Sequence, residues 1–508
     1  MRNCCKRRGS GVRRTAALNA HPDMPEATRN IPRIVVAGTS SGVGKTTVAV
    51  GLVAALRARG LVVQSFKCGP DYIDPSYHSR AAGRPCRNLD SWMLDDSRVA
   101  GVFGRACAGA DIAVIEGVMG LFDGSDFEDD RASAAQIARL LDAPVLLVLD
   151  ISKSARSIAA VARGFEHFDP GTPVAAFVLN NAGTEAHAGG CAAAIARHCR
   201  APVVGWLPRN AAFAVGERHL GLVYESGRRA SDEFIRGLGA EVAKRFDLDA
   251  IIGLAARITP PAAAPDLRCL PEPGRGRGAS QTPRPLLAVA RDDAFCFYYP
   301  DNLDLLEAAG ARIAYFKPAQ GERPPPGAAG VYLGGGYPEL HAKALSENSA
   351  LWNDLKNAHA RGVPIFAECG GFMALAGTLV DAEGRRWPMA GLVPGVVRMG
   401  GRLAGFGYRH ATALRSNFLV AAGETLRAHE FHYSTWEIEA PDPGGGAATH
   451  VPFAWLSRAA RRDAPGAPCG CAHGNLLASY LHMHFGQRDG LAERFVARMR
   501  DPLAGPPE

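Results

Sequence analysis

The chain has 508 residues, of which 47% are hydrophobic and 21% charged, a composition typical of a folded globular protein and unlike a disordered or fibrous one. Its net charge of +7 lies mostly in residues 1–33, where eight Lys and Arg face only Asp23 and Glu26, so the remaining chain indicates no basic face for nucleic acid. No run of 18 or more apolar residues marks a membrane span, and twelve scattered cysteines favour a reducing cytoplasm.

Residues 1–30 are predicted to be a basic, disordered tail outside the fold. The tail lacks the apolar segment and small-residue cleavage site of a secretory signal. Met24 offers an alternative translation start that would remove most of the excess charge. We therefore expect the folded part to begin near residue 31.

A phosphate-binding loop is indicated by Gly38–Thr47, with the sequence Gly-Thr-Ser-Ser-Gly-Val-Gly-Lys-Thr-Thr. The apolar run Ile34–Ala37 before it predicts a buried strand, and the spacing of apolar residues over Thr46–Arg59 predicts a helix. Strand, glycine turn and helix are the context in which backbone N–H groups, a lysine and a threonine hold phosphates. The standard spacing would put the first glycine at Thr39, so Gly38 makes this a variant loop.

The repetition of strand and helix continues to about Leu254 and predicts a doubly wound parallel sheet. The expected strands after the loop are 61–66, 112–115, 145–149, 174–179 and 203–207, and the expected crossover helices include 132–141 and 155–165. We predict a first α/β domain over residues 31–257.

Four carboxylates follow two of these strands. Asp71 and Asp74 come after the strand ending near Phe66, and Glu116 and Asp123 come after the strand 112–115. Because ligands of open parallel sheets bind at the carboxyl ends of the strands, these acids and the phosphate loop predict a magnesium nucleotide site.

A change in composition marks the end of this domain. Residues 258–285 are rich in Pro and Gly, with seven prolines between Thr259 and Pro285, and predict a linker. Strand and helix alternation restarts with strands 286–290, 312–316, 331–333 and 363–367 and a helix over 302–309. We predict a second doubly wound α/β domain over residues 286–500.

Cys369 follows the last of these strands in the sequence Ala-Glu-Cys-Gly-Gly, which predicts a nucleophile on a strand-to-helix turn. A thiol at a helix N-terminus is expected to have a lowered pKa. The glycines Gly335, Gly336 and Gly370 are candidates to supply backbone N–H groups to an oxyanion.

His482 is the candidate general base, in the segment Ser-Tyr-Leu-His-Met-His-Phe. His482 and His484 alternate as on a strand and would then share a face. A zinc site with His473, Cys469 and Cys471 is an alternative, although no Cys-x-x-Cys pair supports it.

With these motifs the chain resembles the a,c-diamide synthases of cobalamin biosynthesis, which amidate cobyrinic or hydrogenobyrinic acid. The first domain is similar to dethiobiotin synthetase, including its loop spacing, and the second to class I glutamine amidotransferases. The resemblance runs from about Arg33 to about Phe485 through Gly38–Thr47, Phe66–Pro75, Asn88–Asp90, Val114–Gly124, Tyr298–Leu303, Tyr332–Glu339 and Ala367–Gly371.

The resemblance implies a carbon–nitrogen ligase that uses Mg²⁺, ATP and glutamine. Cys369, activated by His482, would release ammonia from glutamine bound at Gly335, Gly336 and Gly370. Ammonia would then attack an acyl phosphate made from a corrin acetate and ATP. ATP would bind at Gly42, Gly44, Lys45, Thr46 and Thr47, while Mg²⁺ and the acetate would be held by Thr46, Asp71, Asp74, Glu116 and Asp123. Many class I amidotransferases have Glu where this chain has His484, so a Cys-His dyad is implied and the group that orients His482 stays open.

Two other functions fit parts of the sequence. A cobyric acid synthase would amidate other corrin side chains, although Phe66–Pro75 favours the a,c enzyme. A P-loop partition or metal-insertion ATPase would have no need of a cysteine elbow. The expected partner is a corrinoid small molecule, without nucleic acid or membrane, and the sequence is compatible with a homodimer.

Overall fold

The computed structural model describes residues 31–210, 228–257, 283–438, 451–460 and 465–503. Its first part is a seven-stranded sheet in which every pairing between neighbouring strands is parallel, in the order β3-β2-β4-β1-β5-β6-β7. The strands are β1 (Arg33–Gly38), β2 (Val63–Cys68), β3 (Arg87–Leu89), β4 (Ile112–Glu116), β5 (Val145–Asp150), β6 (Val174–Ala182) and β7 (Val203–Pro208). The doubly wound parallel sheet expected from the sequence is confirmed, and the short strand β3 was not anticipated.

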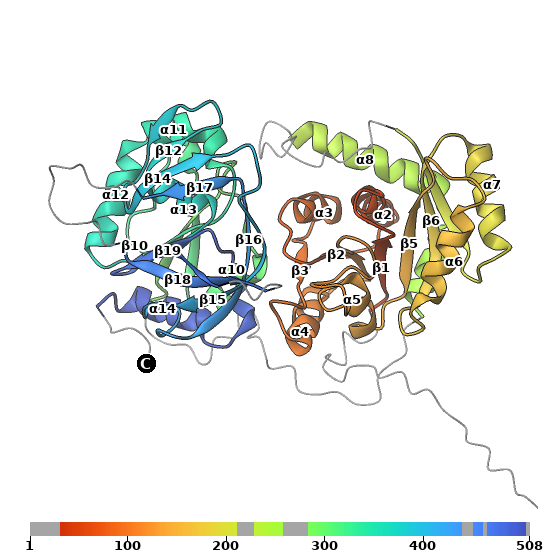
Figure 1. Cartoon of the computed structure of the whole chain (residues 1–508), viewed down its shortest axis with the longest axis horizontal. Helices are drawn as coiled ribbons and strands as arrows, with labels where there is room; N and C mark the ends of the chain where they lie inside the picture. The colour runs from red at the N-terminus through yellow and green to blue at the C-terminus, as the bar shows by residue number, and fades with distance from the viewer. Residues whose placement is uncertain (1–30, 211–227, 258–282, 439–450, 461–464, 504–508) are drawn as a thin grey trace, which may run out of the picture.

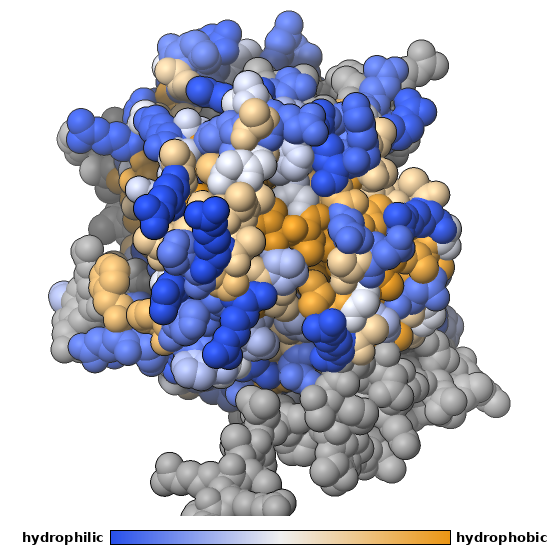
Figure 2. All heavy atoms as spheres, turned by 90° about the vertical axis from the view of Figure 1, so that its right-hand side faces the viewer, coloured by the Kyte–Doolittle hydropathy of each residue, from blue (hydrophilic) through white to orange (hydrophobic). Residues whose placement is uncertain are grey.

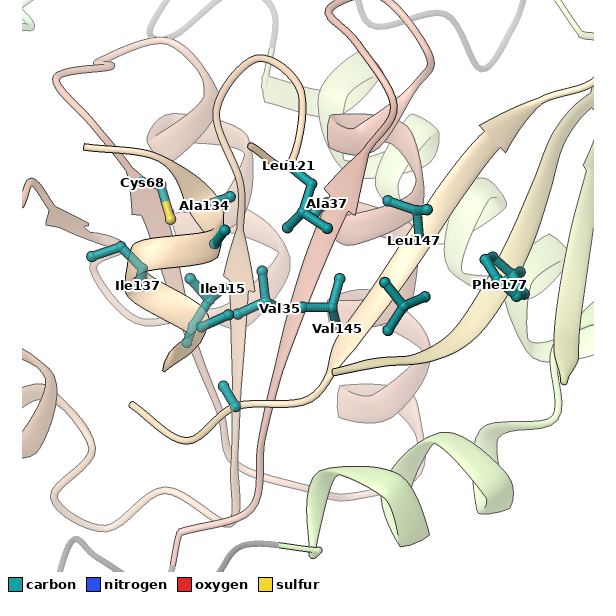
Figure 3. Close-up of a cluster of buried hydrophobic side chains, with 14 of the residues drawn as sticks. Val35, Ala37, Cys68, Ile115, Leu121, Ala134, Ile137, Val145, Leu147 and Phe177 are labelled. Carbon is teal, nitrogen blue, oxygen red and sulfur yellow. The ribbon is translucent and has the colours of Figure 1, made fainter. Parts of the chain in front are cut away.

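Both faces of this sheet are buried. On β1, Val35 and Ala37 belong to one apolar cluster, whereas Ile34 and Val36 belong to another on the opposite face. Figure 3 shows the first cluster, in which Val35 lies among residues of the neighbouring strands and of α5. Burial on both faces explains why these strands are continuous apolar runs.

Helices cover the two faces of the first sheet (Figure 1). Residues of α2 (Lys45–Ala58), α3 (Asp74–Ala82), α8 (Arg228–Arg245) and α9 (Leu248–Ala255) pack on the face of Ile34. Residues of α4 (Asp96–Ala106), α5 (Ala134–Leu140), α6 (Ile158–Phe168) and α7 (Glu185–Ala196) pack on the face of Val35. We call this sheet with its helices the first domain.

The second domain is built on a nine-stranded mixed sheet, in the order β16-β15-β18-β19-β20-β11-β10-β8-β9. Its parallel part consists of β8 (Leu286–Ala290), β9 (Arg312–Phe316), β10 (Ala328–Leu333), β11 (Ile365–Glu368) and β20 (Leu476–Ser479). The antiparallel part consists of β15 (Gly405–Ala413), β16 (Thr425–His432), β18 (Phe453–Ala459) and β19 (Ala467–His473).

A separate four-stranded sheet contains β12 (Ala376–Val380), β13 (Arg386–Pro388), β14 (Val393–Met399) and β17 (Ser434–Glu437). The helices are α10 (Pro300–Ala308), α11 (Ala342–Glu347), α12 (Ser349–Ala360), α13 (Gly370–Leu375) and α14 (Leu491–Arg500), with 3₁₀ turns at Pro318–Gln320, Pro338–His341 and Phe485–Gln487. The sequence predicted the α/β alternation of this domain but none of its antiparallel strands.

Two segments predicted from the sequence lie outside the described residues. The tail 1–30 and most of the linker, residues 258–282, lie outside them, so the domain boundaries stay predictions. Among the described residues no helix is long and apolar enough to cross a membrane.

Figure 2 shows the face over α6 and α7, where hydrophobic residues lie between hydrophilic ones. On α6, Val161 is 41% exposed. The homodimer also stays a prediction.

Candidate active sites

The phosphate-binding loop has the predicted geometry. It connects β1 to α2, which begins at Lys45, and Gly42 and Gly44 adopt left-handed φ angles of 78° and 91°. A Cβ atom on Gly44 would lie 2.0 Å from Nδ2 of Asn180, which itself donates to the Val43 carbonyl at 2.8 Å. Only glycine fits this close approach, so the loop is held in a fixed shape at the helix N-terminus.

Thr46 lies at the centre of a buried acid cluster. Its hydroxyl donates to Glu116 Oε1 at 2.6 Å and to Asp74 Oδ2 at 3.3 Å. The ammonium of Lys67 donates to the same two carboxylates, at 2.6 Å to Asp74 and 2.8 Å to Glu116, and His78 contacts the other oxygen of Glu116. Three predicted site residues from three elements therefore meet at one point.

The charges of this cluster are strongly coupled. Burial opposes ionisation of Glu116, but Lys67 and His78 hold its pKa well below the usual value. Burial and the neighbouring charge of Glu116 raise the pKa of Asp74. The oxygens of Thr46, Asp74 and Glu116 that contact one another and Lys67 are hard ligands. Mg²⁺ prefers ligands of this kind.

The other two predicted acids, Asp71 and Asp123, accept hydrogen bonds from backbone N–H groups. Asp71 Oδ1 accepts hydrogen bonds from the amides of Ile73 and Asp74, and its other oxygen lies 3.9 Å from the Lys67 ammonium. Asp123 Oδ2 accepts from the amide of Gly120 at 2.8 Å. The structure thus brings Asp74 and Glu116 together around Thr46, with Asp71 and Asp123 holding the loops at its edge.

Cys369 sits on the predicted strand-to-helix turn between β11 and α13. Its φ of 47° and ψ of −102° are strained for a residue with a side chain. The turn is close-packed, because a Cβ on Gly371 would lie 2.2 Å from the Leu333 carbonyl oxygen and one on Gly370 2.9 Å from the Gly336 nitrogen. The expectation of a lowered thiol pKa is wrong for this state: burial and the nearby Glu339 raise the pKa of Cys369.

His482 lies beside the glycine loop after β10. A Cβ on Gly335 would come within 2.6 Å of the His482 ring carbon Cε1, so the ring packs directly on this loop. The backbone of His482 pairs with that of His429 through hydrogen bonds of 2.8 and 2.9 Å. Within the described residues no hydrogen bond joins the His482 ring to Cys369, although both lie against the loop Gly334–Gly336.

His482 is uncharged in this environment, since burial and the proximity of His429 lower its pKa to about 3. In the described part of the chain its Nδ1 atom has no hydrogen-bond partner. His484 does not supply one: its Nδ1 accepts from the Gly486 amide at 3.0 Å and its ring packs against Tyr299. The expected extended strand is also absent there, because β20 ends at Ser479.

The zinc alternative is not supported. Among the residues that the structure describes, no group of three or more His, Cys, Asp and Glu side chains is arranged to hold a metal ion. His473 instead contacts the carbonyl oxygen of Leu392 at 3.0 Å.

Tyr72 connects the two candidate sites. It stands between Asp71 and Asp74 in the first domain, and its ring lies 4.9 Å from that of His482 and 5.3 Å from that of Phe297 in the second. Phe297 in turn donates its backbone N–H to the Gly335 carbonyl. The acid loop of one site therefore packs on the histidine and glycine loop of the other.

Sequence reasoning assigned no role to Lys67, His78 or Tyr72. Lys67 gave a usable signal, because a lysine near the carboxyl end of an apolar buried strand needs a partner. His78 is the fifth residue of α3 and Tyr72 contacts a segment more than 200 residues away, so neither had a local pattern.

Comparison with known families gave two domain matches. Residues 34–222 match the CobQ/CobB/MinD/ParA nucleotide binding domain, and residues 287–490 match the CobB/CobQ-like glutamine amidotransferase domain.

Curated relatives match over nearly the whole chain. A cobyrinate a,c-diamide synthase of Dehalococcoides mccartyi (strain CBDB1) is 41% identical over 93% of this chain and 99% of its own length. One of Salmonella typhimurium is 40% identical over 92% of this chain and 98% of its own. A hydrogenobyrinate a,c-diamide synthase of Streptomyces coelicolor is 40% identical over the same shares of the two chains.

Two solved structures show partial matches to the chain. PurLQS from Thermotoga maritima, at 15% identity, covers 42% of this chain and 97% of its own with a TM-score of 0.29. A glutamine amidotransferase at 14% identity covers 42% and 95% with a TM-score of 0.28. Both TM-scores are low, so the fold is defined by the two sheets and the two domain matches.

Proposed function

Because the chain belongs to the family of cobyrinate and hydrogenobyrinate a,c-diamide synthases, we propose that it amidates the a and c acetate carboxylates of cobyrinic or hydrogenobyrinic acid. ATP and glutamine are the co-substrates, in keeping with its nucleotide-binding and glutamine amidotransferase domains. A free carboxylate is a poor electrophile, so each acetate has to be activated before ammonia can attack it.

The first domain activates the acetate. Lys45 and the backbone N–H groups of Gly42–Thr47 bind the phosphates of ATP, and the terminal phosphoryl group passes to a carboxylate oxygen of the corrinoid. ADP leaves, and an acyl phosphate remains. Asp71 and Asp123, which hold the loops beside the acid cluster, are the candidates to position the acetate.

Thr46, Asp74 and Glu116 are the residues that would hold Mg²⁺. The Thr46 hydroxyl oxygen lies 2.6 Å from Glu116 Oε1 and 3.3 Å from Asp74 Oδ2, and all three oxygens are hard ligands. The ion would neutralise phosphate charge. Until it binds, Lys67 compensates the charge of the two carboxylates.

The second domain supplies ammonia. The Cys369 sulfur attacks the side-chain amide carbon of glutamine, His482 takes the thiol proton and passes it to the leaving nitrogen, and water then hydrolyses the thioester to glutamate. The N–H groups around Gly335, Gly336 and Gly370 stabilise the oxyanion. Ammonia attacks the acyl phosphate, and inorganic phosphate leaves.

One observation carries this proposal: a strained cysteine on a strand-to-helix turn occurs in one chain with a phosphate loop and a buried acid cluster. The experiment is incubation with ATP, Mg²⁺ and glutamine together with either cobyrinate or hydrogenobyrinate, followed by mass spectrometry of the corrinoid. We expect the mass change of two amidations with one of the two substrates. An unchanged mass with both would refute the proposed function.

A further inference from the structure

Three antiparallel strands of the second domain carry a row of basic side chains. His410 on β15 stands directly opposite Arg427 on β16 and directly opposite Arg458 on β18. Residues directly opposite each other in an antiparallel sheet point to the same face. Positive charges held in such a row repel one another, so Arg427 and Arg458 on either side of His410 would favour an anion bound over them.

The first domain completes the row. The His410 ring lies 5.2 Å from that of Trp92, and Arg427 donates to the Trp92 carbonyl at 2.8 Å. Arg131 acts electrostatically on both His410 and Arg427, and its neighbour Ala132 packs in the same apolar cluster as Trp92. We call Arg131, His410, Arg427 and Arg458 the basic row.

Within the described residues no carboxylate forms an ion pair with a side chain of the row. Arg131 and Arg458 are both exposed. Asp90 and Asp95 act electrostatically on Arg427 without forming an ion pair with it in that part of the chain, and Asp90 accepts hydrogen bonds from Trp92, Met93 and Tyr408. Burial and the surrounding arginines lower the pKa of His410, in accord with uncompensated positive charge.

The row borders the site where the acetate is activated. Tyr408, two residues before His410, donates to Asp90 and lies 3.8 Å from the position a Cβ would take on Gly69, just after Lys67. Arg131 lies with Asp123 in the connection between β4 and α5, and its carbonyl accepts from the Ser125 amide at 2.7 Å. Figure 1 shows β16 at the side of the second domain that faces the first.

We propose that the basic row binds the carboxylates of the corrinoid that are not being amidated, and so orients the macrocycle between the two domains. This inference rests on the proposed function. The proposed substrate suits such a row because it carries several carboxylates. Only the a and c groups are amidated, so the other carboxylates stay anionic. ATP is the other anion of the reaction, but its phosphates have their own cradle on α2.

Equilibrium binding of the corrinoid to the whole protein, without ATP or glutamine, tests the inference. We expect Arg458→Gln and Arg131→Gln each to raise the Kd about three- to tenfold, as for the loss of one charge-assisted contact. The Kd should rise less steeply with salt in the variants than in the wild type. Arg458→Lys, which keeps the charge, should restore most of the affinity.

Kinetics supply the control. The KM for the corrinoid should rise in both glutamine variants, while the KM values for ATP and glutamine stay as in the wild type. Arg398→Gln removes an equally exposed arginine, paired with Glu437 on the separate four-stranded sheet, and should leave corrinoid binding unchanged. If the wild type amidates the corrinoid but Arg458→Gln and Arg131→Gln both bind it with the wild-type Kd, the inference about the basic row is overturned and the proposed function is not. Absence of amidation by the wild type would instead count against the proposed function.

Discussion

Lys45 and Lys67 are both buried next to the nucleotide site, yet their pKa values move in opposite directions. Burial, reinforced by the charge of Lys67, lowers the pKa of Lys45 to about 8, and its ammonium donates a hydrogen bond to the Ser40 carbonyl. Burial also opposes the charge of Lys67, but contacts with Glu116 and Asp74 raise its pKa well above the usual value. Among the described residues Lys45 forms no ion pair, in keeping with its proposed role of binding a phosphate.

The pKa of Lys45 predicts a pH dependence of ATP binding. Above pH 8 Lys45 is neutral in the free protein, and bound phosphates favour its charged form, so binding at pH 9 should take up a proton and weaken up to tenfold per pH unit. Below pH 7 Lys45 should contribute no uptake. Calorimetry in buffers of different ionisation enthalpy measures this, with Lys45→Met as the control that should lose the uptake. Equal proton uptake at pH 7 and pH 9 would contradict the shifted pKa.

At the level of elements, the sequence revealed the features whose signals are local. The phosphate loop between β1 and α2, and the cysteine turn between β11 and α13, were predicted because glycines and the nucleophile are neighbours in the chain. The antiparallel strands β15, β16 and β18 were missed, and the pairing of β15 with β18 joins segments that are distant in the sequence. The raised pKa of Cys369 was missed because burial and Glu339 cause it, and neither can be seen in the residues around the cysteine.

Tyr72 packs against His482 across the two domains. We expect loss of its ring to impair the use of glutamine while the amidation step itself remains. Among the described residues the Nδ1 atom of His482 has no hydrogen-bond partner, so its ring is positioned by packing against Tyr72 and the Gly335 loop. Tyr72→Ala should lower kcat for glutamine-dependent amidation about 10- to 100-fold, as for a misplaced catalytic group, with little change in the KM for glutamine.

Two comparisons make this prediction specific. Tyr72→Phe keeps the ring and should stay near the wild-type rate, and amidation by added ammonia should persist in Tyr72→Ala. If Tyr72→Ala used glutamine at the wild-type kcat, packing by Tyr72 would not position His482.

On the scale of the whole molecule, a buried ion cluster joins the domains. Asp301 on α10 accepts from Arg105 on α4 at 2.5 Å and lies 3.5 Å from Arg87 on β3. Burial opposes ionisation of Asp301, but the two arginines lower its pKa. With Tyr72 and the basic row, this cluster holds the acid site and the cysteine site in one assembly.

Asp301→Asn should destabilise the protein by about 3–5 kcal/mol, because Arg105 would be left with a buried, uncompensated charge. Denaturant unfolding measures the free energy. Asp249→Asn removes the acid of the exposed pair with Arg59 and should have little effect. An equal, small effect of both substitutions would show that the Asp301 cluster does not stabilise the contact between domains.

The central claim is that one chain makes ammonia at Cys369 and consumes it at an acyl phosphate formed beside Lys45. The most direct measurement is the rate of corrinoid amidation by Cys369→Ala and Lys45→Ala, each with glutamine and with a high concentration of ammonia. We predict that Cys369→Ala loses amidation with glutamine and retains it with ammonia, whereas Lys45→Ala loses both. Use of glutamine by Cys369→Ala, or amidation from ammonia by Lys45→Ala, would contradict the account.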